Sequence, residues 1–297
     1  MTRKQAFLFS HVADKLRVLA LTLITAGAST FALADSHPEP GKGSILSLGD
    51  SVVFGYITAG GYTYGHASNF IGYPDYVGSE LGLQVANASC PGETTGGFIS
   101  PTQPDNGCRP FRANFPLHAA YGATQLAYAT HYLSTHKKTR LVTVGLGAND
   151  GFLLIQACGG VPACIQAGLP AALGAVYANL NTILGNLRAS GHRGVLMVVN
   201  YYSTDYTDQA GTGLTYALNQ TLAAAAAANG AVVADVFSAF LAAASTPAAG
   251  GNTCKAGLLN ASPANPYVCD VHPSQSGQML LARTVAATYA RVARRDD

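Results

Sequence analysis

The sequence is poor in charged side chains and contains no tryptophan. Only 11% of the 297 residues are Asp, Glu, Lys or Arg, whereas 48% are hydrophobic. So small a charged fraction excludes a disordered, solvating chain, and the apolar share is that of a globular protein with ample core. Because tryptophan is absent while alanine and glycine are abundant, we expect closely packed helices rather than large aromatic clusters. Length alone allows one large domain or two ordinary ones.

Beyond the first 34 residues, the sequence also lacks an excess of positive charge. Residues 1–34 hold four basic residues and Asp14, so the rest of the chain has 13 Lys and Arg against 14 Asp and Glu. The formal net charge of residues 35–297 is therefore −1, although that of the whole chain is +2. A nucleic-acid partner requires a basic surface, and we expect no such partner.

The N-terminal residues have the pattern of a secretory signal peptide. Four basic residues precede an uncharged run over 18–34, which ends in Ala32-Leu33-Ala34. The small residues at 32 and 34 predict cleavage after Ala34. The alternative is a retained membrane anchor, but the run is shorter than the roughly 20 residues that span a bilayer. We therefore expect a secreted protein, extracellular or periplasmic, with no stable membrane anchor and no other segment that could cross a membrane.

The six cysteines contain no Cys-x-x-Cys pair, and no His-x-x-x-His accompanies them. Zinc is therefore the weaker interpretation, and we expect no metal. An even number of cysteines in an exported chain favours disulfides. The cysteines fall into three couples that are close in sequence. The simplest pairing is Cys90–Cys108, Cys158–Cys164 and Cys254–Cys269.

After a loose linker at residues 35–42, strand-like segments alternate with helix-like ones. Strands are expected at 44–48, 84–88, 140–146, 194–200 and 231–236. Helices are expected at 69–81, 118–134, 171–189, 215–229 and 274–292. Strands that are apolar on both sides and separated by helices predict an α/β fold, with a parallel sheet covered by helices on both faces. No further linker or internal repeat is present, so we expect residues 43–297 to form a single domain.

Candidate catalytic residues follow the first strand and precede the last helix. The first strand ends in Gly49-Asp50-Ser51, a tight turn that would expose the serine hydroxyl at the carboxyl edge of the sheet, where ligands bind. A serine nucleophile needs a histidine that accepts its proton, and that histidine needs a partner that orients it. His272 is the strongest of the eight histidines, because it lies in the last loop at this edge, directly before the closing helix.

An oxyanion formed at this serine requires hydrogen-bond donors aimed at the same point. Gly92 follows the second strand, where its backbone N–H can approach closely, and Asn149 stands at the end of the third. Each is ordinary alone, since Pro-Gly and Asn-Asp pairs usually form turns. Their value lies in their order at the ends of successive strands.

Taken together, these segments resemble the SGNH (GDSL) hydrolase family, whose four blocks occur here in family order across nearly all of residues 43–297. The matching segments are Gly49-Asp50-Ser51 with Gly55, Gly92, Gly147-Ala148-Asn149-Asp150 and His272-Pro273. The resemblance implies that Ser51 is the nucleophile and His272 the base. It implies an oxyanion hole made by the backbone N–H groups of Ser51 and Gly92 and the side chain of Asn149. It also implies a three-layer α/β/α sandwich around a five-stranded parallel sheet. The Gly-x-Ser-x-Gly elbow of ordinary α/β-hydrolases is absent.

The last block departs from the family pattern. The family usually has Asp-x-x-His, whereas here Cys269 stands three residues before the histidine and Asp270 two before. Either Asp270 orients the imidazole from this shifted position, or a backbone carbonyl replaces the carboxylate in a dyad. We favour Asp270, because a carboxylate also stabilises the imidazolium that forms when His272 takes a proton.

The resemblance implies a serine esterase or lipase that needs no cofactor, acting on a small-molecule or lipid ester. We expect it to be a monomer. One alternative on the same scaffold is a carbohydrate O-acetyl esterase, which would lose activity steeply on esters longer than acetate. A less favoured alternative is a non-catalytic exported binding protein.

Overall fold

The computed structural model describes residues 43–58, 61–262 and 265–296. These belong to the second of the two units into which the chain divides, Met1–Asp35 and Ser36–Asp297. The predicted signal peptide at 1–34 and linker at 35–42 lie outside the described residues.

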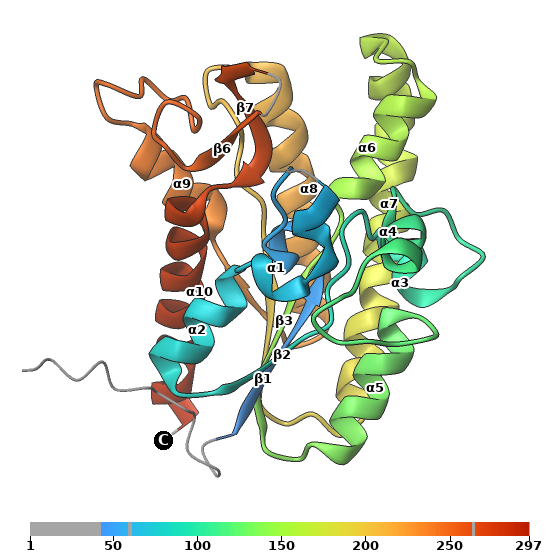
Figure 1. Cartoon of the computed structure of the whole chain (residues 1–297). Helices are drawn as coiled ribbons and strands as arrows, with labels where there is room; N and C mark the ends of the chain where they lie inside the picture. Colours follow the sequence, from blue (N-terminus) through green and yellow to red (C-terminus); the bar gives the residue numbers. More distant parts are fainter. Residues whose placement is uncertain (1–42, 59–60, 263–264, 297) are drawn as a thin grey trace, which may run out of the picture. The chain divides into compact units, whose positions relative to one another are not determined.

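Five parallel strands form a sheet with the order β2-β1-β3-β4-β5 (Figure 1). The strands are β1 (Ser44–Gly49), β2 (Gln84–Asn87), β3 (Thr139–Gly145), β4 (Val195–Val199) and β5 (Val232–Ala234). Each lies within two residues of its expected position. The prediction of a five-stranded parallel sheet is therefore confirmed.

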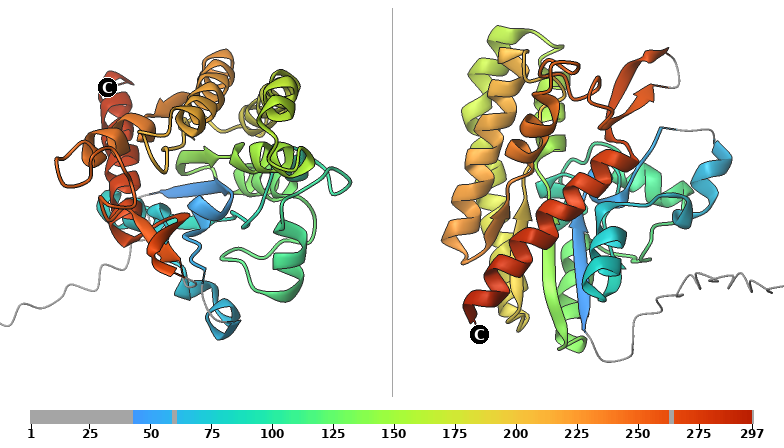
Figure 2. Two further views of the ribbon diagram at one scale, coloured as in Figure 1. Left: turned by 90° about the horizontal axis from the view of Figure 1, so that it is seen from above. Right: turned by 90° about the vertical axis from the view of Figure 1, so that its left-hand side faces the viewer.

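Helices cover both faces of this sheet, as Figures 1 and 2 show. One layer contains α2 (Tyr73–Leu81), α9 (Val236–Ala244) and α10 (Gln275–Asp296). The other contains α5 (Gln125–Thr135), α7 (Pro162–Ala189) and α8 (Gln209–Ala228). Successive strand residues point to opposite faces, so Leu46 packs in the second layer's core while its neighbour Ile45 packs in the first. The expected three-layer α/β/α architecture is confirmed.

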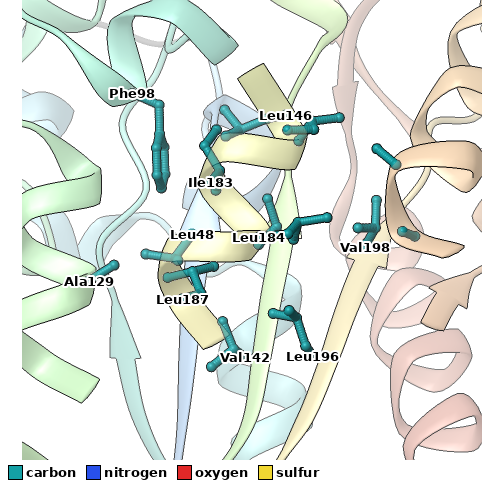
Figure 3. Packing of buried hydrophobic residues seen from close by; sticks show 14 of the residues in the cluster. Leu48, Phe98, Ala129, Val142, Leu146, Ile183, Leu184, Leu187, Leu196 and Val198 are labelled. Carbon is teal, nitrogen blue, oxygen red and sulfur yellow. The ribbon is translucent and has the colours of Figure 1, made fainter. Parts of the chain in front are cut away.

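Figure 3 shows how α7 packs on the sheet. Ile183, Leu184 and Leu187 of this helix are fully buried, as are the strand residues Val142 and Val198. A buried aliphatic side chain contributes about 1.5–3 kcal/mol relative to an exposed one. The C-terminal half of α7 is therefore anchored on the sheet. It holds in place the N-terminal half, which forms one wall above the carboxyl ends of the strands.

The N-terminal part of α7 corrects the sequence analysis in two respects. The helix begins at Pro162, nine residues before the expected start at 171, and continues through Pro170. A proline interrupts the backbone hydrogen-bond ladder, but Pro170 is exposed, and water can hydrate the carbonyl that it leaves unpaired. By length and composition α7 could also cross a bilayer, contrary to expectation. Only 11% of the apolar window of this helix is buried, although the side chains that face the sheet from Val176 to Leu187 pack in the core.

Shorter helices lie between the main elements and were not predicted. They are α1 (Ser51–Phe54), η1 (Gly61–Gly65), η2 (Ala67–Asn69), α3 (Thr95–Ile99), α4 (Cys108–Asn114) and α6 (Ala148–Ala157). Most are too brief for a hydrophobic period to emerge from the sequence. Both α1 and α6 begin directly after sheet strands, at the edge where a site is expected.

A two-stranded antiparallel sheet precedes α10, where the sequence analysis expected a loop. It consists of β6 (Leu259–Ser262) and β7 (Asn265–Pro273). The expectation of a loop around His272 is therefore wrong, since this residue lies on β7. In Figure 1 the hairpin and α6 both lie beyond the same end of the sheet.

Candidate active site

The turn after β1 is built by local constraints on Gly49, Asp50 and Gly55. A Cβ atom at Gly49 would lie 2.3 Å from the carbonyl oxygen of Gly145 on the neighbouring strand, so no larger residue fits. Asp50 caps α1, because its carboxylate accepts a hydrogen bond from the backbone N–H of Val52 at 3.0 Å. Gly55 ends the helix with a left-handed φ of 78°. Ser51 is thus the first residue of a one-turn helix at the carboxyl end of β1, the second strand from one edge of the sheet.

Gln125 holds the same turn from α5. Its amide accepts from the Gly49 N–H at 2.8 Å and donates to the Gly49 carbonyl at 2.9 Å. The side chain is fully buried and also donates to Glu93, the residue after Gly92, at 3.2 Å. Gln125 therefore ties together the first two blocks. The sequence analysis missed Gln125. The only sign of its role in the sequence is that a polar residue stands among apolar ones where a helix begins.

Gly92 and Asn149 have conformations that suit oxyanion donors. Gly92 has a φ of 82°, and a Cβ there would lie 2.5 Å from the carbonyl oxygen of Asn106. The Asn149 amide donates one hydrogen bond to the carbonyl of Glu93 at 3.0 Å. Its oxygen accepts from the Asn106 amide at 2.8 Å, which fixes the orientation of the side chain. An amide has two N–H donors, so Asn149 keeps a second one for a ligand.

His272 forms a close pair with Asp270 on β7. The distance between His272 Nδ1 and Asp270 Oδ1 is 2.7 Å, and the His272 backbone N–H donates to the same oxygen at 3.2 Å. Residues two apart on a strand point to the same face, which explains how the shifted spacing still pairs them. Cys269, three residues before the histidine, bonds to Cys254 instead. The carboxylate beside the imidazole is therefore that of Asp270.

The other oxygen of Asp270 accepts a hydrogen bond from the hydroxyl of Thr58. Partial burial alone would raise the pKa of Asp270, but the hydrogen bonds from His272 and Thr58 outweigh burial and lower the pKa to about 2. Asp270 is therefore charged at neutral pH. Thr58 has no signal in the sequence, since it lies 212 residues from Asp270.

Asp50 caps the turn on which it lies, whereas Asp150 joins the start of α6 to Thr95 on α3. Asp50 is buried and accepts from the Tyr201 hydroxyl at 2.5 Å, and burial raises its pKa to about 6. Asp150 accepts from the backbone N–H and hydroxyl of Thr95 at 3.0 and 2.6 Å. Burial raises the pKa of Asp150 as well.

The three disulfides join the predicted cysteines and surround the site. The pairs are Cys90–Cys108, Cys158–Cys164 and Cys254–Cys269. The first closes the loop that carries Gly92, and the third fastens β7. The second joins the end of α6 to the start of α7.

One cavity of about 600 Å³ lies at this edge of the sheet. Among its lining residues are the four candidates for chemistry, Ser51, Gly92, Asn149 and His272. Tyr201 and Tyr202, which follow β4, also line it. Residues from the ends of β1, β2 and β3 and from the β6–β7 hairpin thus face the same space.

An aromatic cluster forms one side of the cavity. The expectation, drawn from the lack of tryptophan, that the protein has no large aromatic clusters is therefore wrong. Tyr56 and Phe111 line the cavity, and the Tyr56 ring centroid lies 4.8 Å from that of His272. The cluster is extended by further rings, namely Phe54, Tyr64, Phe70 and Phe115. Tyrosine and phenylalanine thus supply the aromatic packing that tryptophan does not.

Arg109 and Arg112, in the loop and helix after Cys90, do not line the cavity. Arg109 forms an ion pair with Asp105, and Arg112 donates to the carbonyl of Ala123. Within the described part of the chain, no group of three or more His, Cys, Asp or Glu residues is placed to hold a metal ion.

The model of the GDSL-like Lipase/Acylhydrolase family matches residues 47–280. The chain belongs to this family. The resemblance to SGNH (GDSL) hydrolases is confirmed, and membership supports ester hydrolysis as the coarse activity of this GDSL-like chain. No curated protein matches it in sequence.

Solved structures with the same fold are distant in sequence from this GDSL-like chain. The phospholipase A1 of Streptomyces albidoflavus is 16% identical with a TM-score of 0.55, and the match covers 83% of this chain and 99% of that one. An α/β hydrolase from the metagenome of Lake Arreo, Spain, is 13% identical with a TM-score of 0.53, covering 84% and 95%. A GDSL-family lipolytic protein of Veillonella parvula is 15% identical with a TM-score of 0.50, covering 84% and 98%. At these identities the likeness establishes the fold alone.

Proposed function

We propose that this protein is a secreted serine hydrolase that cleaves carboxylic esters through an acyl-enzyme on Ser51. The observation that carries the proposal is the close His272–Asp270 pair, whose histidine lines the same cavity as Ser51, Gly92 and Asn149. A hydroxyl, an imidazole held by a carboxylate and convergent N–H donors are the parts that acyl transfer requires.

In the first half of the reaction, the Ser51 hydroxyl oxygen attacks the ester carbonyl while His272 Nε2 takes its proton. The tetrahedral intermediate collapses when the bond to the alcohol oxygen breaks and His272 returns the proton to that oxygen. In the second half, His272 takes a proton from water, which attacks the acyl-enzyme. The acid leaves, and Ser51 recovers its proton.

Asp270 holds the imidazole with Nδ1 protonated, so that Nε2 is free to accept the serine proton. Its low pKa keeps it negatively charged, and this charge stabilises the imidazolium in both half-reactions. The developing oxyanion is stabilised by the N–H groups of Ser51 and Gly92 and by the second N–H of Asn149.

Secretion is supported by the signal-peptide pattern at residues 1–34 and is consistent with the three disulfides. We expect the purified mature protein to be monomeric.

The proposal is tested by hydrolysis of p-nitrophenyl butyrate by the wild-type protein and by Ser51→Ala. We expect Ser51→Ala to lose essentially all turnover while its circular dichroism and melting temperature stay those of the wild type. Turnover by a folded Ser51→Ala protein at the wild-type rate would exclude Ser51 as the nucleophile.

A further inference from the structure

Much of the cavity is lined by apolar side chains that play no part in the hydrophobic core. They lie on α6, α7 and α8, are only partly buried and belong to neither of the two core clusters. The six largest are Leu154, Ile155, Ile165, Leu169, Leu173 and Leu214. Apolar surface left facing a cavity is not explained by folding, because it gains little from burial. It instead suits an apolar ligand.

These side chains form stripes along their helices. On α7 the lining residues recur at the spacing of one helix face, from Ile165 through Leu169 and Leu173 to Val176, where the stripe joins the hydrophobic core. The stripe from 165 to 176 is about 17 Å long at the rise of an α-helix. A second stripe on α8 includes Leu214 and packs beside α7. The apolar lining is thus elongated rather than a small pocket at the serine.

Charge is confined to the catalytic end of the cavity. Asp50, Asp150 and, when protonated, His272 are the charged groups among the lining residues. From residue 151 to residue 187, which includes all of the α7 stripe, the sequence has no Asp, Glu, Lys, Arg or His. A ligand that extends away from Ser51 between these helices therefore meets neither a charge to pair with nor one to repel it.

We infer that the space between α6, α7 and α8 is the acyl-chain subsite, and that the protein prefers esters of medium-length or long aliphatic acids. The inference rests on the proposed function, since it places the acyl carbonyl at Ser51. The subsite gives each methylene of the chain an apolar surface to bury against. Each added methylene should raise kcat/KM roughly fourfold, the equivalent of about 0.8 kcal/mol, until the chain fills the space.

Two adjacent alanines on α7 offer a matched test. Ala172 lines the cavity, whereas Ala171 is exposed and does not line it. Ala172→Trp fills the subsite, and Ala171→Trp makes the same change on the outer surface of the same helix. Melting temperature and circular dichroism establish that both variants fold.

The experiment measures kcat/KM for p-nitrophenyl acetate, butyrate, octanoate and decanoate with the wild type and both variants. We expect the octanoate-to-acetate ratio to exceed 100 in the wild type and in Ala171→Trp, and to fall at least tenfold in Ala172→Trp. A wild-type profile that falls steeply beyond acetate would overturn the inference and indicate a deacetylase. A ratio in Ala172→Trp equal to that in Ala171→Trp would overturn it too.

A binding measurement separates this inference from the proposed mechanism. The Ser51→Ala protein is titrated calorimetrically with ethyl octanoate and ethyl acetate, without and with the added Ala172→Trp change. Tighter binding of the octanoate that is lost with Ala172→Trp supports the subsite. If the wild type showed no ester turnover at the same time, only the proposed mechanism would be contradicted. Equal binding of the two esters contradicts the subsite, whatever the turnover.

Discussion

The two sides of the candidate site are built in different ways. Ser51, Gly92 and Asn149 follow β1, β2 and β3, and buried contacts from Gln125 and Asn106 hold their backbone and side chains. The proposed general base, His272, comes from outside this sheet, on the antiparallel β6–β7 hairpin.

The hairpin side depends on a few specific links. Cys254–Cys269 fastens β7, and Thr58 holds Asp270 from a loop far away in sequence. The buried core supports the sheet side throughout, whereas the hairpin side is held by these separate links and by others such as the hydrogen bond from the Tyr202 hydroxyl to the Val271 carbonyl at 2.6 Å. Apart from loss of this disulfide, we expect changes on the hairpin side to affect catalysis more than overall stability.

The largest effect is expected from Asp270→Asn. The substitution keeps the shape but removes the charge and favours the wrong imidazole tautomer, so kcat should fall by roughly 10³- to 10⁴-fold. Stopped assays with p-nitrophenyl butyrate at pH 7 measure the loss. A kcat within threefold of the wild type would mean that a backbone carbonyl orients His272.

On the sheet side, Asn149→Ala removes one proposed oxyanion donor. Such a donor contributes about 10²- to 10³-fold in kcat. KM should change little, because the donor acts on the charge that develops in the transition state. Asn106→Ala, which frees the Asn149 amide to rotate, should produce a smaller loss of the same kind. A loss confined to KM in both variants would place Asn149 in substrate binding only.

The disulfides allow the two regions to be compared directly. The double variant of Cys254→Ser and Cys269→Ser opens a link of 15 residues and should lower the free energy of unfolding by about 3 kcal/mol. It should also lower kcat, because β7 carries both His272 and Asp270. The matched pair, Cys158→Ser with Cys164→Ser, opens a link of only 6 residues and should cost less stability. Urea unfolding and kcat on butyrate are measured for both. Equal losses of kcat would show that the hairpin has no special dependence on its bridge.

A smaller effect is expected from Thr58→Val, which removes one hydrogen bond to Asp270 at constant shape. We expect kcat to fall about tenfold, in line with a hydrogen bond to a charged group. Thr58→Ser keeps the hydroxyl and should restore activity. Failure of serine to restore it would indicate that Thr58 acts through packing instead.

The two sides should also respond to pH in opposite directions. Burial, only partly offset by a hydrogen bond from Gln125, raises the pKa of Glu93 on the sheet side to about 7. The folded protein therefore binds more protons than the unfolded chain between pH 4.5 and about 7, and Glu93 lowers stability as the pH rises through this window. Because the pKa of Asp270 is lowered in the folded protein, Asp270 stabilises the fold above about pH 4. This stabilisation is lost only in acid, as the pH falls from about 4 to about 2.

Glu93→Gln should flatten the decline of stability between pH 4.5 and 7, although the buried Asp50 keeps part of the slope. Urea midpoints across this range measure it. An unchanged slope would show that Glu93 titrates normally in the folded protein.

The sequence predicts the sheet side far better than the hairpin side. Strand β4 is a continuous apolar run, and β3 is apolar at Leu141, Val142 and Val144. The positions of the strands, and the edge at which the residues after them meet, therefore follow from local pattern and topology. The hairpin has no such pattern, because its nine-residue strand β7 alternates weakly and contains Pro266 and Pro273. His272 is predicted from its position directly before the last helix and from its motif, not from the pattern of the hairpin. Gln125 and Thr58 could not be predicted, since their partners lie 76 and 212 residues away in the chain.

The central claim is that Ser51 is the one nucleophile activated by His272. The most direct measurement is the site of covalent labelling by an alkyl organophosphonate, located by peptide mass spectrometry. We predict one adduct per chain, on Ser51, and a strongly reduced labelling rate in His272→Ala. An adduct on another residue, or labelling of Ser51 at the same rate without His272, would contradict the account.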